Sequence, residues 1–238
     1  MNTPSPSPFE TRVVSRLGAL APLDTHEWEA LAEAQLVRHR VAAHRNIIEE
    51  GARVTSPRII LAGWAGRTRI FADGRRQILS LLLPGDLIGK CRQSHPLAAT
   101  GAVALTDVTL CPAPDSRHAK HGLAEAYARS SALEEYYLFR QIARLGRMSA
   151  YERIVDLLLE VRERLGAVAL GPKDSFHFPI TQEALADLLG LTSVHVNRTL
   201  KALRQDGLID LRSSTMHIKD PAVLAALVEH RPAAVFEN

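Results

Sequence analysis

The stretch TQEALADLLGLTSVHVNRTLKALRQDGLI, residues 181–209, contains two short apolar repeats with helical spacing, separated by a glycine. Apolar residues three and four positions apart form one face of a helix, so the stretch predicts two helices joined by a tight turn. Ala186 is small enough to let the helices approach, and Gly190 can adopt the positive φ that the turn requires. This pattern is typical of a helix-turn-helix whose second helix covers about 193–205, with Thr192 as its cap.

The second helix is predicted to have one buried and one polar face. At about 100° of rotation per residue, the buried face contains Val196, Thr199, Leu200 and Leu203. The opposite face suits DNA, because a helix fits the major groove and an arginine can bond both acceptors of a guanine edge. We predict base contacts from Ser193, Val194, Asn197 and Arg198. We predict phosphate contacts, which position the protein without reading sequence, from Thr192, Lys201, Arg204, Arg212 and Ser213.

The residues around the helix pair complete a larger motif. The alternating segment SFHFPI, residues 175–180, predicts a strand before the pair. The segment GLIDLRSSTMHIKD, residues 207–220, predicts a hairpin after it, with 212–214 at the tip. Helix, strand, two helices and hairpin, in that order, indicate a winged helix-turn-helix.

The N-terminal half of the chain has a different sequence pattern. Short β-branched or leucine-rich runs between residues 38 and 113 are separated by turn signals, which predicts a small antiparallel roll. In FADGRRQILSLLL, residues 71–83, Asp73-Gly74 predicts a hairpin with a type I′ turn. Further turns are expected at Gly51, Gly63, Gly66 and Pro84-Gly85.

A long helix is predicted between these two parts, over residues 119–147. Its apolar stripe drifts round the helix towards Leu138, Ile142 and Leu145, so two faces are apolar. A helix that packs only on its own roll needs one such face, and we therefore favour a second face that pairs with another copy of the chain. Ser149 with Glu152 has capping-box spacing and marks the start of the next helix.

The predicted fold class is α+β, with an N-terminal antiparallel, jelly-roll-like β-roll, a long dimerisation helix and a C-terminal winged helix-turn-helix. We predict a Pro/Ser-rich tail and lead-in segment over 1–20, a sensor roll over 21–118, the dimerisation helix over 119–147 and the DNA-binding domain over 148–238.

Composition sets the remaining limits. The chain is 46% hydrophobic and 23% charged, which is typical of a globular protein, and its start lacks the pattern of a secretory signal. With no apolar run long enough to span a bilayer, we expect a cytoplasmic protein without a membrane partner. Residues 148–238 contain 10 Lys and Arg against 12 Asp and Glu, a net charge of −2, so a DNA-binding assignment depends on local geometry.

The chain resembles the bacterial Crp/Fnr family of transcription regulators over nearly its whole length. The motifs YERIVDLLLEV, GRRQILSLLLPGDLIG and the helix-turn-helix stretch carry the resemblance. It implies a homodimer on double-stranded DNA with a palindromic operator, contact with RNA polymerase if the protein is an activator, and a base-reading role for Arg198. Many members have a glutamate close before that arginine, whereas this chain has Ser193 and Val194, so the operator cannot be transferred from them.

The resemblance also locates an effector pocket, formed by Leu138 of the long helix and by five roll residues, Gly85, Asp86, Leu87, Ala99 and Thr100. Cyclic-nucleotide binders of the family have an arginine after the proline that here precedes Leu97, and that arginine neutralises the cyclic phosphate. A phosphate buried without an ionic partner is costly. We therefore expect no control by cAMP, and we predict no cofactor.

Other family sensors require different residues. An iron-sulfur cluster requires four cysteines, and the chain has two, so we expect neither a cluster nor another metal site. Cys91 and His95, in CRQSH, lie near where the resemblance locates haem ligands, and Cys91 is flanked by cations that favour a reactive thiolate. We favour ordinary loop or core roles for both over haem binding or redox sensing.

Two other classes of function remain as alternatives. The chain contains no glycine-rich phosphate loop, His-Glu-x-x-His motif or nucleophile elbow, so we predict no catalytic residues and no enzyme. A ligand-binding regulatory module, whose winged helix contacts protein rather than DNA, is the second alternative to a DNA-binding regulator.

Overall fold

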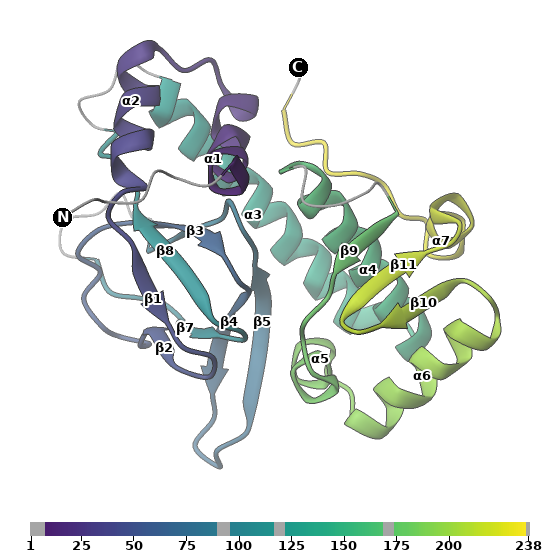
Figure 1. Cartoon of the computed structure of the whole chain (residues 1–238). Coiled ribbons are helices and arrows are strands. Elements are labelled where there is room, and N and C mark those ends of the chain that lie inside the picture. The colour runs from purple at the N-terminus through teal and green to yellow at the C-terminus, as the bar shows by residue number, and fades with distance from the viewer. Residues whose placement is uncertain (1–7, 90–95, 117–121, 169–173, 237–238) are drawn as a thin grey trace. The chain divides into compact units, whose positions relative to one another are not determined.

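The structure is a computed structural model that describes residues 8–89, 96–116, 122–168 and 174–236. They form two compact units (Figure 1). The first comprises residues 1–68, 81–135 and 235–238, and the second comprises 69–80 and 136–234. The helix α3, Gly122–Arg147, contributes its first half to one unit and its second half to the other.

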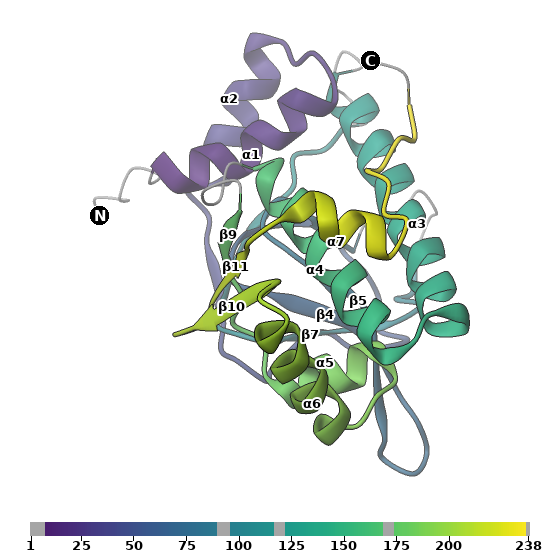
Figure 2. The same ribbon diagram turned by 90° about the vertical axis from the view of Figure 1, so that its right-hand side faces the viewer.

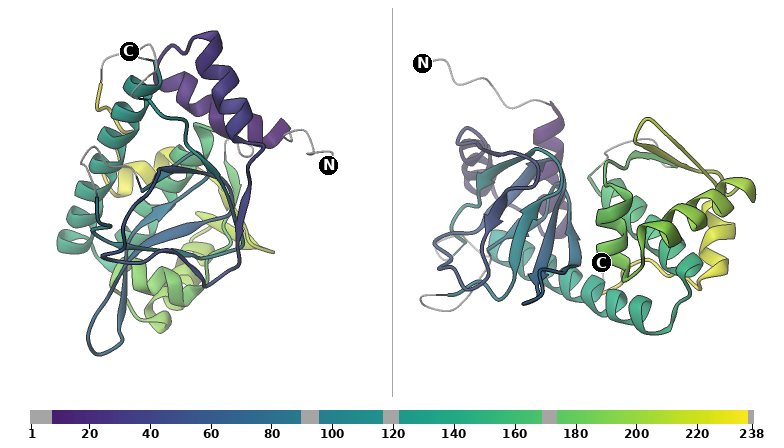
Figure 3. Two further views of the ribbon diagram at one scale, coloured as in Figure 1. Left: turned by 90° about the vertical axis from the view of Figure 1, so that its left-hand side faces the viewer. Right: turned by 90° about the horizontal axis from the view of Figure 1, so that it is seen from below.

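The first unit contains most of an antiparallel roll made of two four-stranded sheets, seen edge-on in the right-hand view of Figure 3. The strand orders are β1-β8-β3-β6 and β2-β7-β4-β5. The strands are β1 His39–Val41, β2 Asn46–Ile48, β3 Arg58–Ala62, β4 Ala65–Ile70, β5 Arg76–Leu82, β6 Leu87–Ile88, β7 Gly101–Ala104 and β8 Val108–Pro112.

Apolar side chains from both sheets fill the roll. Because successive residues of a strand point to opposite faces, short runs with alternating apolar residues supply this interior. The core comprises Ile47, Ile60, Ala65, Leu82, Ile88, Ala102, Ala104, Val108 and Leu110. These observations confirm the predicted antiparallel roll.

Two details of the predicted turns were wrong. The β4–β5 hairpin is present, but of the predicted Asp73-Gly74 pair only Gly74 has a positive φ, +84°, whereas a type I′ turn requires two. The loop spans five residues, with the Gly74 N–H donating to the Phe71 carbonyl. Gly66 is not a turn residue but a buried residue of β4 paired with Val103.

Two helices precede the roll. The first, α1 Pro8–Leu20, lies in the segment 1–20 that was predicted to be a Pro/Ser-rich tail and lead-in, and no helix was predicted there. Proline is well tolerated in the first helical turn, where its missing N–H would have no partner. One face of α1 is buried through Val13, Val14, Leu17 and Leu20.

The second helix, α2 Thr25–Ala34, is fixed at its start. Asp24 is the N-cap and forms a capping box with Glu27. The buried Glu27 carboxylate also accepts the Leu123 backbone N–H at 2.9 Å, which ties α2 to the first turn of α3. Helix α3 begins within the range 119–147 that was predicted for the long helix. Residues 119–121 of that range lie outside the described residues.

The second unit contains the winged helix-turn-helix (Figure 2). Helix α4 packs against the other helices and its capping box of Ser149 and Glu152 is present, as predicted. The strands form a three-stranded sheet in the order β10-β11-β9. The elements are α4 Ala150–Gly166, β9 Ser175–His177, α5 Gln182–Leu189, α6 Ser193–Gln205, β10 Ile209–Arg212, β11 Thr215–Ile218 and α7 Pro221–Leu227.

Candidate nucleic-acid interface

The turn between α5 and α6 has the geometry that its sequence predicts. Gly190 ends α5 with φ +63° and ψ +40°, a left-handed conformation that favours glycine. Its N–H donates to the carbonyl of Ala186, which is itself buried where the helices meet. Thr192 then caps α6 by accepting the His195 N–H at 3.2 Å. This local chemistry fixes the start of α6 at Ser193.

One face of α6 is buried, as predicted from the helical wheel. Val196 and Leu203 are fully buried, and Thr199 and Leu200 are less than 10% exposed. These side chains pack where α6 contacts α4 and α5, so the rotation of α6 about its own axis is determined by the core.

The opposite face of α6 is exposed. Val194 has 76% of its surface exposed, which is high for a β-branched apolar residue and leaves its methyl groups available to a partner. The other residues of this face, all exposed, are Ser193, Asn197, Arg198, Lys201 and Arg204. The predicted base-contacting and phosphate-contacting residues of α6 thus lie together, and their individual roles remain predictions.

Gln182, the first residue of α5, also belongs to this surface. Its Oε1 accepts a hydrogen bond from the Asn197 side-chain amide at 3.1 Å, and both residues are exposed. Gln182 was not among the residues predicted from the sequence. The only available signal was its position directly after the Thr181 cap, at the N-terminal end of α5.

The hairpin of β10 and β11, which forms the wing, contains the other two residues that we predict to contact phosphates. Ser213 and Ser214 form the turn between β10 and β11 with φ values of +47° and +58°, so a tight turn forms without glycine. Arg212 is exposed and forms an ion pair with Asp210 at 2.9 Å. A phosphate at the wing would therefore compete with Asp210 for this guanidinium.

Arg153 on α4 binds backbone carbonyls at the end of α5 and near the end of α3. Its guanidinium donates to the Leu189 carbonyl at 2.8 Å, to the Leu145 carbonyl at 2.9 Å and to the Met148 carbonyl at 2.9 Å. The last turns of α5 and α3 have carbonyls without helical partners, and one cation satisfies them together. Arg153 was not among the residues predicted from the sequence.

A buried ionic network joins α3 to α4. The Arg144 guanidinium, 1% exposed, donates to the Asp156 carboxylate at 2.8 Å and to Glu160 at 2.7 Å. Arg140 donates to Asp156, and Arg164 donates to Glu160 at 2.9 Å. Although burial opposes ionisation, hydrogen bonds from His230 and Arg140 and the charge of Arg144 lower the pKa of Asp156 below its ordinary value.

The segment after α7 returns to this network. His230 Nδ1 lies 3.3 Å from the Asp156 carboxylate, and its Nε2 lies 3.6 Å from the Glu163 carboxylate. Glu163 also accepts the Ala233 N–H at 2.9 Å. Burial opposes protonation of His230, but hydrogen bonds to the two carboxylates raise its pKa above the ordinary value.

The predicted effector residues of the roll are partly engaged within the protein. Asp86 accepts a hydrogen bond from the buried Arg16 at 2.8 Å and another from the Leu83 N–H at 2.7 Å. Arg16 also donates to the Gly85 carbonyl at 2.8 Å. The remaining predicted residues are Leu87, which is buried, Thr100 and Leu138, which are half-buried, and Ala99, which is exposed.

Leu97 occupies the position at which cyclic-nucleotide binders of the resembling family have arginine. It is 67% exposed and forms an isolated bridge with Arg53. The predicted haem or redox candidates Cys91 and His95 lie outside the described residues. Within the described ranges, no group of three or more His, Cys, Asp or Glu side chains could hold a metal ion.

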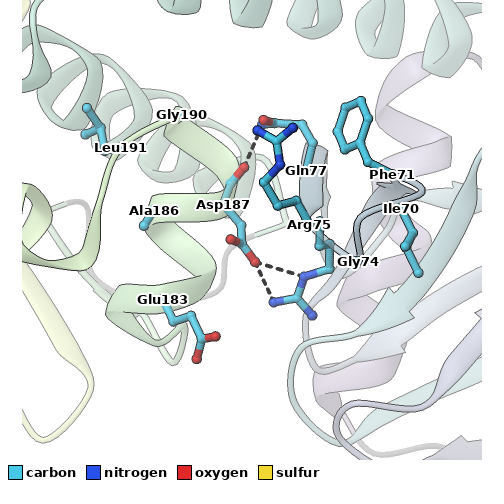
Figure 4. Close-up of a pocket in the computed structure, with 11 residues that line it drawn as sticks. Ile70, Phe71, Gly74, Arg75, Gln77, Glu183, Ala186, Asp187, Gly190 and Leu191 are labelled. Carbon is cyan, nitrogen blue, oxygen red and sulfur yellow. Dashed lines mark hydrogen bonds and ion pairs between the residues drawn. The ribbon is translucent and has the colours of Figure 1, made fainter.

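The second unit also contains a pocket where the loop of the β4–β5 hairpin lies beside α5 (Figure 4). Arg76 donates to the Asp187 carboxylate at 2.7 Å, and Arg75 forms an ion pair with Asp73 at 2.7 Å. Both arginines are therefore already paired with carboxylates, which weakens their attraction for an anionic ligand. The residues that line this pocket include none of the predicted effector residues.

The fold and the exposed helix face define a class of protein. A ligand-binding-type roll, a long helix and a winged helix-turn-helix in one chain are the parts of a DNA-binding transcription regulator. Residues 38–118 match the model of the cyclic nucleotide-binding domain, and residues 152–227 match that of the Crp-like helix-turn-helix domain. The chain belongs to the Crp/Fnr family. It is accordingly a transcription regulator and not an enzyme.

Individual relatives are similar over most of the chain. It is 32% identical to the transcriptional activator protein FnrL of Cereibacter sphaeroides, over 79% of this chain and 78% of that protein. It is 30% identical to the nitrogen fixation regulation protein FixK of Bradyrhizobium diazoefficiens, over 80% and 81%. The structure of FixK2 from Bradyrhizobium japonicum matches with a TM-score of 0.68 at 23% identity, covering 80% of this chain and 96% of that one, and so supports the fold.

Among the described residues, no helix combines the length and apolarity needed to cross a membrane.

Proposed function

We propose that the protein binds double-stranded DNA as a homodimer at a palindromic operator, with α6 of each copy in the major groove. The observation that carries this proposal is the face of α6 opposite its buried residues, where three cations, an amide and an exposed valine lie together. Arg198 can donate both hydrogen bonds to a guanine edge, and Val194 can contact a thymine methyl group. Asn197 and Ser193 complete the proposed base-contacting set.

Phosphate contacts would position the protein on the duplex. Lys201 and Arg204 extend the cationic face towards the C-terminal end of α6, and Thr192 lies at its start. Arg212 and Ser213 at the wing supply a second, separate point of contact. Because each neutralised phosphate releases counterions, binding should weaken steeply as the salt concentration rises.

The dimer is proposed to form through α3. Phe139 is 62% exposed and Ile142 is 68% exposed, and they lie three residues apart on one face of the helix. Large apolar side chains gathered on one exposed helix face favour pairing with an equivalent helix. A two-fold symmetric dimer would present its two α6 helices to half-sites one turn of DNA apart.

We propose four functional parts with the boundaries expected from the sequence: a lead-in segment over 1–20, the sensor roll over 21–118, the dimerisation helix over 119–147 and the DNA-binding domain over 148–238. A signal in the roll would act by favouring the spacing of the two α6 helices that fits DNA.

The effector is proposed not to be cAMP. Leu97 offers no charge to a cyclic phosphate, and Asp86 is already paired with Arg16. An iron-sulfur cluster is also disfavoured, because the chain has two cysteines. Haem binding through Cys91 and His95 is the less favoured reading of those residues, and no cofactor is proposed.

A cytoplasmic location without a membrane partner is proposed, because operator DNA and RNA polymerase are there in bacteria. FnrL is named a transcriptional activator. If this protein also activates, RNA polymerase is a further partner.

Selection of bound sequences from a random DNA pool by the full-length protein tests the proposal. We expect a two-fold symmetric motif whose half-sites are separated by one helical turn, and a dimer by sedimentation. The alternative function, a winged helix that contacts protein, predicts instead no enrichment and no salt-dependent binding of random duplex. Repeating the selection with cell extract tests whether a diffusible effector changes the motif or its affinity.

A further inference from the structure

Gln182 restricts the hydrogen bonds that Asn197 can offer to DNA. The Asn197 amide donates one N–H to Gln182 Oε1 at 3.1 Å. We propose that this bond makes Asn197 a reader of adenine and Gln182 its positioning residue. The inference rests on the proposed function, because it requires α6 to lie in the major groove.

The number of donors in an asparagine side chain carries the chemical argument. The amide has two N–H donors and one carbonyl oxygen. With one N–H donated to Gln182, one donor and the Oδ1 acceptor remain. The major-groove edge of adenine presents the complementary pair, an acceptor at N7 and a donor at N6. Asn197 can therefore bond adenine with both remaining groups while it keeps its bond to Gln182.

The same bond disfavours guanine. Guanine presents two acceptors, N7 and O6, in the major groove. A free asparagine amide could turn its NH2 group towards them by rotation about its last side-chain torsion. In this structure one N–H is already donated, so guanine would leave the Oδ1 of Asn197 facing an acceptor or would require the bond to Gln182 to break. Discrimination between adenine and guanine thus depends on Gln182.

The positions of the two residues support such a pairing. Gln182 begins α5, whose start is fixed by the Thr181 cap, and Asn197 lies in the second turn of α6 on its exposed face. Both side chains are exposed to solvent, so a DNA duplex can reach the hydrogen bond between them. The Gln182 amide nitrogen retains its own N–H groups, which can donate to a neighbouring phosphate.

Random-pool selection with variants of the full-length protein tests the inference. For the wild-type protein we expect an adenine at one position of each half-site. Asn197→Ala should abolish the preference there, with a loss of roughly 5- to 150-fold in affinity for the adenine site. Gln182→Ala should admit guanine at the same position and leave the rest of the motif unchanged. Gln205→Ala is the matched control, because it removes an exposed glutamine from the last position of α6.

The conservative variant Gln182→Glu separates positioning from a general effect on the fold. A carboxylate still accepts the Asn197 N–H, so the adenine preference should be retained, whereas repulsion between this carboxylate and the phosphates should lower affinity for all duplexes, most at low salt. Melting temperatures should match the wild-type value for every variant.

Two results would overturn the inference alone: a base other than adenine at the Asn197-dependent position, or a Gln182→Ala motif identical to that of the wild-type protein while Arg198→Ala still alters it. A wild-type protein that enriches no sequence at all would instead overturn the proposed function, and the inference with it.

Discussion

The Arg144 guanidinium donates to the Asp156 carboxylate at 2.8 Å, and each of the two side chains is only 1% exposed. One residue lies in the second half of α3 and the other in α4, so the bond fixes these two helices to each other. Glu160 accepts a second hydrogen bond from the same guanidinium, which leaves α4 with two points of attachment. Because α6 packs on α4, α6 is also held to α3, the helix that we propose forms the dimer.

Removal of Arg144 should destabilise the protein strongly. In Arg144→Met, Asp156 and Glu160 would remain buried with less compensation, and loss of one partner of a buried pair costs about 3–5 kcal/mol. Urea unfolding, followed by circular dichroism, measures the change in the free energy of unfolding. The control is Arg162→Met, which removes a more exposed ion pair with Asp174 and should cost less than about 1 kcal/mol. Equal losses in the two variants would contradict the structural role of Arg144.

The contribution of His230 to stability should be lost as the pH rises, because the folded state raises the pKa of this side chain. Its folded-state pKa is raised above 6.5 by hydrogen bonds to Asp156 and Glu163, against burial and the nearby Arg140 charge. A raised pKa gives a contribution that is complete below about pH 6.5 and is lost as pH rises through the folded value. The difference in unfolding free energy between the wild-type protein and His230→Gln should therefore shrink from pH 6 to pH 9, two assay values chosen to bracket roughly this transition. A difference that stays constant would show that His230 is not charged in the folded protein, and His217→Gln, on exposed β11 surface, is the control.

Arg198 and Lys201 should affect DNA binding in different ways. Arg198→Ala should cost about 1–3 kcal/mol at the selected operator and relax base preference at one position of each half-site. Lys201→Ala should weaken binding to all duplexes similarly and reduce the salt dependence by about one phosphate contact. Titrations of operator and random duplex at several salt concentrations distinguish the two effects. If both variants lose affinity equally on both duplexes, the division between base and phosphate contacts is wrong.

Ile142→Glu should dissociate the dimer. The substitution puts a charge on the apolar face that Ile142 shares with Phe139, and a charge buried without a partner is strongly unfavourable. Sedimentation velocity should detect the monomer, and operator affinity should fall because the half-sites would be bound independently. Val223→Glu, a change of the same kind at a residue 45% exposed on α7, should leave the dimer intact. A dimeric Ile142→Glu protein would place the interface elsewhere.

The sequence alone predicted α6 well because its determinants are local. The Thr192 cap, the left-handed Gly190 and the apolar positions Val196, Leu200 and Leu203 all lie within fifteen residues, and a helical period suffices to find them. The same holds for the capping box at Ser149.

Contacts that join distant residues could not be predicted in this way. Arg16 and Asp86 are 70 positions apart, and Gln182 and Asn197 meet only through the orientation of two side chains. No period or cap indicates such pairs. Helix α1 was missed for a different reason: it lies in the segment predicted as a Pro/Ser-rich tail and lead-in, although proline is tolerated in a first helical turn and Pro8 begins this helix.

The bond from Arg16 to Asp86 links the N-terminal helix to one of the residues that we predict for the effector pocket of the roll. Any ligand hydroxyl that approaches this carboxylate meets a guanidinium already in place, and must either share the acceptor or displace the arginine. Displacement would break the hydrogen bonds from Arg16 to Gly85 and Asp86, so that occupancy of the predicted pocket would loosen one of the contacts between α1 and the roll.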